Sequence, residues 1–398
     1  MLVKKSTETL NLGDKTRAII KGRAPEDHHG VVNTPVYRAS TILHPTVEAF
    51  EQRHDPTNKH RVVYGLLGTP STFDLEEVVA DLEGGYDAVL LPSGLAAITT
   101  ALTTFLSPGD HLLIADTVYW PNRMFCDEHL KRLQVEVEYY DPTLGAGIET
   151  LIKANTKVIF LESPGSLTFE VQDIPAITEV AKRHHVVTIL DNTWATPAFL
   201  KSFSLGIDVS IHAATKYLSG HSDIMMGIII SAEHVAADVR RNHRLFGQTA
   251  SPDDAYTTLR SVRTLATRLK AHEAAGMALA QWLSARDEVE RVLHPALPGH
   301  PGHDFFKRDY LGASGLFGII LKPQPRERMI NMVNGMRLFG IGASWGGYES
   351  LMIPSYPERY RTATAWDSPG QVLRIHAGLE DLDDLLADLD AGLARLRG

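Results

Sequence analysis

Cysteine is almost absent from this sequence of 398 residues, in which Cys126 stands alone. A single cysteine excludes a disulfide framework within the chain and agrees with a reducing compartment. No stretch approaches the roughly 18 uninterrupted apolar residues of a membrane-spanning helix. The N-terminal segment is basic, but it has no apolar core of signal-peptide length. We therefore expect a cytoplasmic protein with no membrane segment.

Positive charge is also in short supply, since 39 Lys and Arg residues face 48 Asp and Glu residues, for a net charge of -9. No basic run is long enough to line a nucleic-acid groove, so we expect no nucleic-acid partner. The hydrophobic content of 44% and the charged content of 22% are those of an ordinary globular protein. A chain of this length is expected to form two or three structural units.

Glycine-rich nucleotide motifs are missing as well. The sequence contains neither the G-x-x-x-x-G-K-[ST] pattern of a phosphate-binding loop nor the G-x-G-x-x-G dinucleotide fingerprint. Histidine is plentiful, and His294, His300 and His303 gather in one Pro- and Gly-rich stretch. No cysteine or carboxylate set with metal-ligand spacing accompanies them. We expect no metal site.

Three parts can be distinguished along the chain. Residues 1–70 have Pro, His and Gly between short apolar pieces, and we expect an arm that wraps around another part of the protein or a neighbouring subunit. Residues 71–262 alternate apolar runs with helix-like segments and predict a large domain. The helix-like stretch 254–285 is expected to bridge to a smaller C-terminal α+β domain over residues 263–398.

Apolar runs of strand length recur through the large domain. Most of them lack the alternation of polar residues found in half-exposed strands, which indicates a sheet covered on both faces. Helix-like segments such as 94–106 and 173–185 lie between them. The predicted fold class is therefore α/β, with a mostly parallel sheet. The runs are 86–91, 111–116, 135–141, 157–162, 186–191 and 224–231.

Parallel sheets bind ligands outside the carboxyl ends of their strands, so the residues that follow each run are candidates for function. Gly94 and Leu95 follow the first run and open a helix, whose free N–H groups can hold an anion such as phosphate. Tyr119 follows the second run closely. The same residues also have ordinary structural explanations. Gly94 can serve as a glycine at a turn, and Tyr119 can be a packed aromatic side chain.

Charged residues follow two later runs. Asp191 directly continues an apolar run, and a buried carboxylate there needs a positive partner or several donors. Thr215 and Lys216 follow the apolar segment that starts at Asp208. Lys216 could be a surface residue, a phosphate ligand or an amine that traps a carbonyl. Phosphate cradle, aromatic ring, carboxylate and lysine together are what pyridoxal 5'-phosphate (PLP) requires.

Long motifs point to one family. The stretches YGLLGTPSTFDLE, LEGGYDAVLLPSG, DTVYWP, VIFLESPGS, DNTWATP, ATKYLSGHSD and SWGGYESL occur in this order. They resemble the Cys/Met-metabolism family of fold-type I PLP-dependent enzymes, and the resemblance covers nearly the whole chain. It implies a fold-type I PLP-dependent transferase-like architecture. Within the family, HPALPG, GHDFFKRDYLGASGLFG and LRIHAGLEDLDDLLADLDAGLARL are similar to the bacterial enzymes that cleave L-cystathionine by β-elimination.

The resemblance implies roles for the residues at the strand ends. Lys216 matches the lysine that forms the Schiff base with PLP and then acts as general base. Asp191 matches the carboxylate that keeps the pyridine nitrogen protonated. Tyr119 matches the tyrosine that stacks on the ring, and Lys216 or Tyr119 is expected to protonate the leaving thiolate.

Phosphate contacts and a residue from another subunit follow from the same resemblance. Gly94, Leu95 and Thr215 are expected at the cofactor phosphate. Tyr64 matches a tyrosine that the family lends from a neighbouring subunit, so we expect a homotetramer with shared sites. The family's usual arginine two positions after that tyrosine is replaced here by Leu66, and this loss of a charge-assisted contact predicts weaker cofactor retention unless Arg61 or backbone donors substitute.

Substrate contacts are expected from the C-terminal domain. Arg374 matches the arginine that grips the substrate α-carboxylate through a bidentate contact, and Ser344 and Trp345 match parts of the same pocket. Relatives that act at Cγ usually have a glutamate where this chain has Ala343 and a leucine in place of Trp345. The resemblance therefore implies β-elimination that yields homocysteine, pyruvate and ammonia in methionine biosynthesis.

Three alternatives remain at this point. The enzyme could act on other cysteine S-conjugates. It could also be a γ-acting relative, of the kind that cleaves or makes cystathionine at Cγ or cleaves methionine. A third possibility is a binding protein that kept the fold and lost the chemistry, although Lys216, Asp191, Tyr119 and Arg374 are all present.

Overall fold

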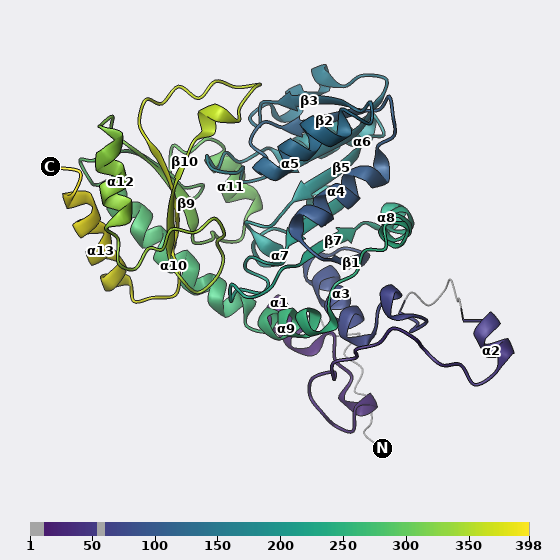
Figure 1. Ribbon diagram of the computed structural model, residues 1–398. Coiled ribbons are helices and arrows are strands. Elements are labelled where there is room, and N and C mark those ends of the chain that lie inside the picture. Colours follow the sequence, from purple (N-terminus) through teal and green to yellow (C-terminus); the bar gives the residue numbers. More distant parts are fainter. Residues whose placement is uncertain (1–11, 54–59, 398) are drawn as a thin grey trace.

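The computed structural model describes residues 12–53 and 60–397 (Figure 1). Residues 1–11 and 54–59, which belong to the predicted arm, lie outside the described residues. Within the described ranges, none of the helices has the length and apolar character needed to cross a membrane. The strands form two sheets, one of seven strands and one of four.

The larger sheet has the strand order β1-β7-β6-β5-β4-β2-β3. Strand β7 runs antiparallel to its neighbours β1 and β6, whereas the other pairs are parallel. The predicted mostly parallel sheet is thus confirmed. Its strands are β1 (Asp87–Leu91), β2 (His111–Ala115), β3 (Glu136–Tyr140), β4 (Thr156–Glu162), β5 (Val187–Asp191), β6 (Val209–Ala213) and β7 (Gly227–Ser231).

Helices cover both faces of this sheet, and alternate residues of β1 show why. Val89 and Leu91 pack into one core with helix α4, while Ala88 and Leu90 pack into another core with α3. Because successive side chains of a strand point to opposite faces, an all-apolar strand requires cover on both sides. The α-helices of this part are α1 (Asp14–Ile20), α2 (Val47–Glu51), α3 (Pro70–Glu83), α4 (Gly94–Phe105), α5 (Trp120–Met124), α6 (Ile174–Arg183), α7 (Thr196–Phe199) and α8 (Glu233–Leu245).

The smaller sheet has the order β10-β11-β9-β8 and is antiparallel throughout. It packs with α10, α12 and α13 around a core of its own, which agrees with the predicted α+β unit (Figure 1). Its elements are β8 (Val289–Leu293), α11 (His303–Asp309), β9 (Leu316–Leu321), α12 (Arg326–Asn334), β10 (Leu351–Ser355), β11 (Val372–His376) and α13 (Leu382–Ala394). The domain boundaries at residues 70 and 262 stay predictions.

The bridge between the two sheets consists of two helices, α9 (Pro252–Val262) and α10 (Leu265–Ser284), and not of one continuous helix over 254–285. The helical conformation is interrupted at Arg263 and Thr264. The Thr264 hydroxyl donates to the carbonyl of Ser261 at 3.1 Å, a local bond that competes with the helical ladder. Arg263 donates to the carbonyls of Lys21 (2.6 Å) and Gly22 (3.1 Å), which anchors the N-terminal segment at this break.

The N-terminal part consists of one portion that packs on the large domain and one that extends away from it. Helix α1 lies on α3, where Arg17 donates to the carbonyl of Asp81 at 2.9 Å, so this portion wraps around its own large domain. The following segment, with α2, extends away from the rest of the chain (Figure 1). It exposes large apolar side chains, among them Leu43 (90%) and Val47 (68%). Such a row of exposed apolar residues is typical of a surface that a partner covers.

Candidate active site

Lys216 lies at the point where the two sheets meet. Strand β6 ends at Ala213, and just beyond it the chain turns so that the Lys216 ammonium group donates to Ser344 Oγ at 2.7 Å. The same nitrogen is 5.4 Å from the centre of the Trp345 ring. The structure thus brings three predicted site residues together, one from the large sheet and two from the C-terminal part.

The Lys216 amine is activated by its surroundings. Burial lowers its pKa to about 8, and the positive charge of Arg374 acts in the same direction, while Asp191 opposes them. An amine with such a pKa has a substantial neutral fraction near physiological pH. A neutral amine is the form that attacks a carbonyl or accepts a proton.

The segment Ser344–Gly347 lies directly against Lys216. Gly346 has φ +85, and a Cβ there would be 2.9 Å from the carbonyl carbon of Lys216 and from the backbone nitrogen of Tyr217. Only glycine tolerates both this φ and this close approach. His376 Nε2 accepts a hydrogen bond from the Gly346 N–H at 3.1 Å and holds the segment from the other side.

Arg374 reaches the same place from β11. Its Nη2 group donates to the carbonyls of Ala343 (2.8 Å) and Ser344 (2.9 Å), which orients the guanidinium. Burial lowers its pKa to about 10, so the group stays charged at neutral pH. A half-buried, oriented guanidinium is well suited to bind a carboxylate.

Asp191 is the last residue of β5 and is only 9% exposed. Its Oδ1 accepts from the Thr193 N–H at 3.0 Å, and burial raises its pKa. The parallel register pairs it with Glu162, the last residue of β4. Glu162 is a residue of this site that our sequence reasoning missed, although the run 157–162 ends on Glu162 just as the run 186–191 ends on Asp191.

Tyr119 follows the end of β2 and is held by this glutamate. Its backbone N–H donates to Glu162 Oε2 at 2.7 Å, and its side chain is 45% exposed. Burial and the charges of Glu162 and Asp191 raise the pKa of the Tyr119 phenol, while Arg374 lowers it. These interactions place the ring among the charged groups of the site, where an aromatic ring can stack on a ligand.

Helix α4 begins at this edge of the sheet. Ser93 caps it, since its Oγ accepts from the Ala96 N–H at 3.1 Å. A Cβ on Gly94 would lie 2.6 Å from the Cβ of Ala213, so glycine lets the helix start pack against the end of β6. Leu95 is 38% exposed beside it. The resulting N-terminus offers backbone N–H groups and a positive dipole end to an anion.

Two further predicted site residues, Thr215 and Tyr64, have contacts outside the cluster around Lys216. The Thr215 hydroxyl bonds the backbone of Met226, accepting from its N–H at 3.0 Å and donating to its carbonyl at 3.3 Å. Tyr64 lies on the extended arm in a surface pocket that Phe50 and Leu67 also line. The phosphate role of Thr215 and the lending of Tyr64 to another subunit stay predictions.

Leu66, which stands where an arginine was expected, lies in the short helical turn Gly65–Leu67. Its side chain has no donor for a phosphate. Arg61 donates from Nη1 to the Gln52 carbonyl at 3.0 Å and is thus engaged within the arm. The prediction of weak cofactor retention is compatible with this geometry and stays a prediction.

A loop from the C-terminal part closes over the end of β2. The Asp116 carboxylate accepts from the backbone N–H groups of Thr362 (3.0 Å), Ala363 (2.9 Å) and Thr364 (2.9 Å). Arg123 forms an ion pair with the same carboxylate. Burial alone would raise the pKa of Asp116, but these backbone donors and Arg123 lower it. Our sequence reasoning missed this anchor because its partners lie some 246 residues further along the chain.

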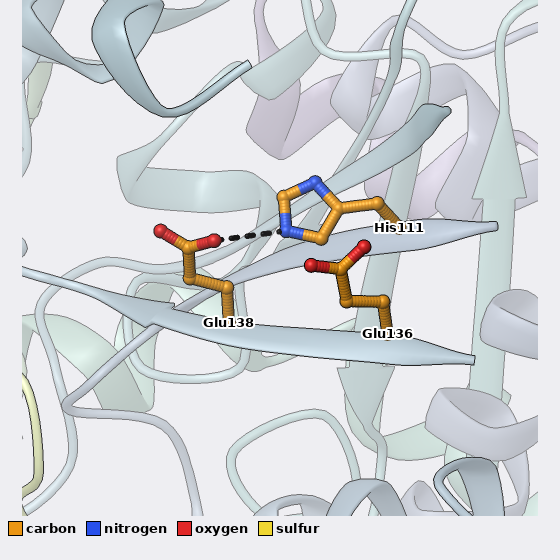
Figure 2. A group of neighbouring side chains, drawn as sticks. All are labelled: His111, Glu136 and Glu138. Atoms are coloured by element: carbon orange, nitrogen blue, oxygen red, sulfur yellow. Dashed lines mark ion pairs between the residues drawn. The ribbon is translucent and has the colours of Figure 1, made fainter. Parts of the chain in front are cut away.

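A second cluster of titratable groups lies at the amino ends of the strands, away from Lys216. His111 begins β2, and Glu136 and Glu138 belong to the neighbouring β3 (Figure 2). The Lys153 ammonium group contacts Glu136 at 2.6 Å and Glu138 at 2.5 Å. The Lys153 ammonium group thus bridges both carboxylates, so the cluster is explained as a salt-bridge network.

The site residues fit PLP. Asp191 is a buried carboxylate suited to a cationic ring nitrogen, Lys216 is an amine with a lowered pKa, and Tyr119 offers an aromatic ring. The start of α4 offers an anion site, and Gly94 lets this helix start pack against the end of β6. These features come from four strand ends at one edge of one sheet, which is where ligands of such sheets bind.

Comparison with known proteins also points to a PLP-dependent enzyme. The profile of the family described as Cys/Met metabolism PLP-dependent enzyme matches residues 15–394. The chain is 42% identical to cystathionine beta-lyase MetC of Escherichia coli K12, over 96% of this chain and 98% of that protein. It is 41% identical to a protein of Wolbachia pipientis wMel named L-alanine/L-glutamate racemase, over 94% of this chain and 95% of that protein.

The fold has a close structural counterpart. The crystal structure of metB from Corynebacterium glutamicum superposes with a TM-score of 0.89 at 28% identity. The match covers 97% of this chain and 99% of the other. The predicted fold-type I architecture is thereby confirmed.

Proposed function

The chain belongs to the Cys/Met metabolism PLP-dependent enzyme family, and we propose that within this family it is a carbon–sulfur lyase acting on L-cystathionine. The reaction breaks the Cβ–S bond and, with one water molecule, gives homocysteine, pyruvate and ammonia. The observation that carries the proposal is the convergence of Lys216, Asp191, Tyr119 and Arg374 on one site. Identity above 40% to an enzyme with that name over nearly the full length supports the choice of reaction.

When bound, PLP supplies an aldehyde carbon that takes up the substrate amine and a conjugated ring that withdraws electrons from Cα. The chain's own residues do the rest. Arg374 binds the substrate α-carboxylate, and the carbonyls that hold its Nη2 group fix the direction of that contact. The buried Asp191 carboxylate would hold the ring nitrogen and would stabilise its positive charge.

Lys216 moves the protons. Its neutral amine takes the proton from Cα, and its position beside Ser344 keeps the nitrogen at the junction of the two domains. As the Cβ–S bond breaks, the sulfur leaves as a thiolate and takes a proton from Lys216 or from the Tyr119 hydroxyl. The Trp345 ring lies beside the same amine, with its centre 5.4 Å from the nitrogen.

The pocket favours elimination at Cβ over chemistry at Cγ. Ala343, where a γ-acting relative has a glutamate, presents only a methyl group and a carbonyl that is already bonded to Arg374. Reaction at Cγ needs additional proton transfers at Cβ, and the segment Ala343–Trp345 offers no carboxylate for them.

A substrate panel tests the proposal. Initial rates with L-cystathionine, L-cystine, L-methionine and L-alanine should give the highest kcat/KM for L-cystathionine and no cleavage of L-methionine. L-alanine is included because a relative is named a racemase. Racemisation of L-alanine with a kcat/KM above that for L-cystathionine would overturn the assignment.

Subunit assembly is part of the same proposal. We infer that the protein is a homotetramer in which the extended arm covers a neighbouring subunit and lends it Tyr64. The exposed apolar side chains of the arm support this, as does the surface position of Tyr64, which is 48% exposed. A cytoplasmic location agrees with Cys126, which is buried and free.

Mixing two inactive variants tests the shared site. Tyr64→Phe and Lys216→Ala should each be nearly inactive alone. After unfolding and refolding together, mixed assemblies should regain activity, because one site then combines Lys216 of one subunit with Tyr64 of another. The absence of regained activity in assemblies shown by mass to be mixed would mean that Tyr64 does not act across subunits.

A further inference from the structure

Two carboxyl groups end neighbouring strands of the cofactor site. Glu162 and Asp191 are direct partners in the parallel register of β4 and β5, so their side chains lie on the same face of the sheet. Each residue is only 9% exposed. The proposed function uses Asp191 and leaves Glu162 without a role.

Glu162 has well-defined contacts. Its Oε2 accepts from the Tyr119 N–H at 2.7 Å, and its Oε1 lies 2.6 Å from Ser166 Oγ. The first contact fixes the backbone of the residue whose ring is expected to stack on the cofactor. The second links it to the turn that follows β4. Glu162 therefore connects three segments of the site, the ends of β2, β4 and β5.

The charges around the pair are unequal. Asp191 faces Glu162 from β5, and the Tyr119 phenol faces both of them from the end of β2. His212 and Lys216 lower the pKa of Asp191, and Arg374 lowers the pKa of Tyr119. Burial first, and the charge of Asp191 second, raise the pKa of Glu162 well above its usual range. Two such carboxyl groups cannot both ionise cheaply, so they titrate as a pair.

We propose that Glu162 is a positioning residue that holds Tyr119 in place, that Glu162 and Asp191 together carry one proton, and that the pair gives this proton up when a cationic ring nitrogen binds Asp191. Binding of the cation neutralises the field of Asp191 at Glu162. Glu162 then ionises and its proton passes to solvent, while its contacts with Tyr119 and Ser166 stay in place. No covalent bond changes in this step, and the inference rests on the PLP assignment alone.

Proton release on ligand binding is the decisive measurement. The full-length protein, freed of cofactor, is titrated calorimetrically with pyridoxamine 5'-phosphate, which has the ring but no aldehyde to react with Lys216. Titrations at pH 7 in buffers of different ionisation enthalpy give the number of protons released. Wild type should release about one proton more per site than Glu162→Gln, because the ligand's own protons cancel in the comparison.

A matched control comes from the same segment of the chain. Glu170 is buried to a similar degree, at 7% exposed, but it pairs with Arg361 outside the cofactor site. Glu170→Gln should release as many protons as wild type. Equal proton release by wild type and Glu162→Gln would overturn the proposal, and this count does not depend on which substrate the enzyme cleaves.

A second variant isolates the positioning role. Glutamine keeps a carbonyl oxygen that can accept from the Tyr119 N–H, so Glu162→Gln should bind pyridoxamine 5'-phosphate within a few-fold of wild type. Glu162→Leu has no acceptor and should bind at least about tenfold more weakly, as expected for loss of a buried hydrogen bond. Equal affinity of the Gln and Leu variants would contradict the anchoring of Tyr119.

Discussion

Replacing Lys216 with alanine lowers kcat for cleavage of L-cystathionine by at least about 10³-fold. A positioned general base alone contributes about 10² to 10⁴ in rate, and the same amine also holds the cofactor covalently. The substitution removes the ammonium group, which donates to Ser344 at 2.7 Å and lies 5.4 Å from the centre of the Trp345 ring, and leaves only a methyl group at Cβ. Alanine can fill neither role.

Steady-state kinetics together with the absorption band of the bound cofactor test this prediction. Lys182→Ala is the control, since Lys182 is an exposed lysine on α6 far from the site residues. It should keep both the rate and the spectrum of wild type. A Lys216→Ala protein that folds, binds PLP and retains more than a tenth of the activity would remove Lys216 from the mechanism.

Replacing Arg374 with lysine lowers kcat/KM for L-cystathionine by about 10²-fold, mainly through a higher KM. The guanidinium is planar and held by the carbonyls of Ala343 and Ser344, whereas an ammonium group cannot make a bidentate contact with a carboxylate. Loss of one hydrogen bond to a charged group costs about 1.5–3 kcal/mol, and the upper part of this range corresponds to the expected change.

Separate measurement of kcat and KM tests whether Arg374 binds the substrate carboxylate. Arg359→Lys is a matched control, because Arg359 is an exposed arginine that stacks on Tyr356 of the same domain. Its kinetics should equal those of wild type. An unchanged KM in Arg374→Lys would show that another group binds the substrate carboxylate.

Local patterns in the sequence were sufficient for much of the fold. Each predicted run from 86–91 to 224–231 corresponds to a strand. Most of these strands are buried on both faces and therefore leave a largely apolar run, whereas β3 lies at the edge of the sheet and alternates with Glu. The residues that follow such runs come together at one edge because parallel strands end there. Lys216 and Asp191 were therefore identifiable from their places at the ends of apolar runs.

Features that depend on distant contacts could not be predicted in this way. The role of Asp116 becomes visible only when the loop around Thr362 folds onto it. The break between α9 and α10 lies within a stretch whose hydrophobic pattern predicts one helix. Glu162 looked like the end of a strand, and its importance follows from the register that places it beside Asp191.

The identity of the keto acid released from L-cystathionine is the most direct test of the proposed reaction. β-Elimination breaks the Cβ–S bond and releases pyruvate with homocysteine, whereas γ-elimination releases 2-oxobutyrate with cysteine. A site with Arg374, Lys216 and a segment at Ala343–Trp345 that offers no carboxylate predicts pyruvate and homocysteine in equal amounts. Formation of 2-oxobutyrate and cysteine as the main products would contradict it.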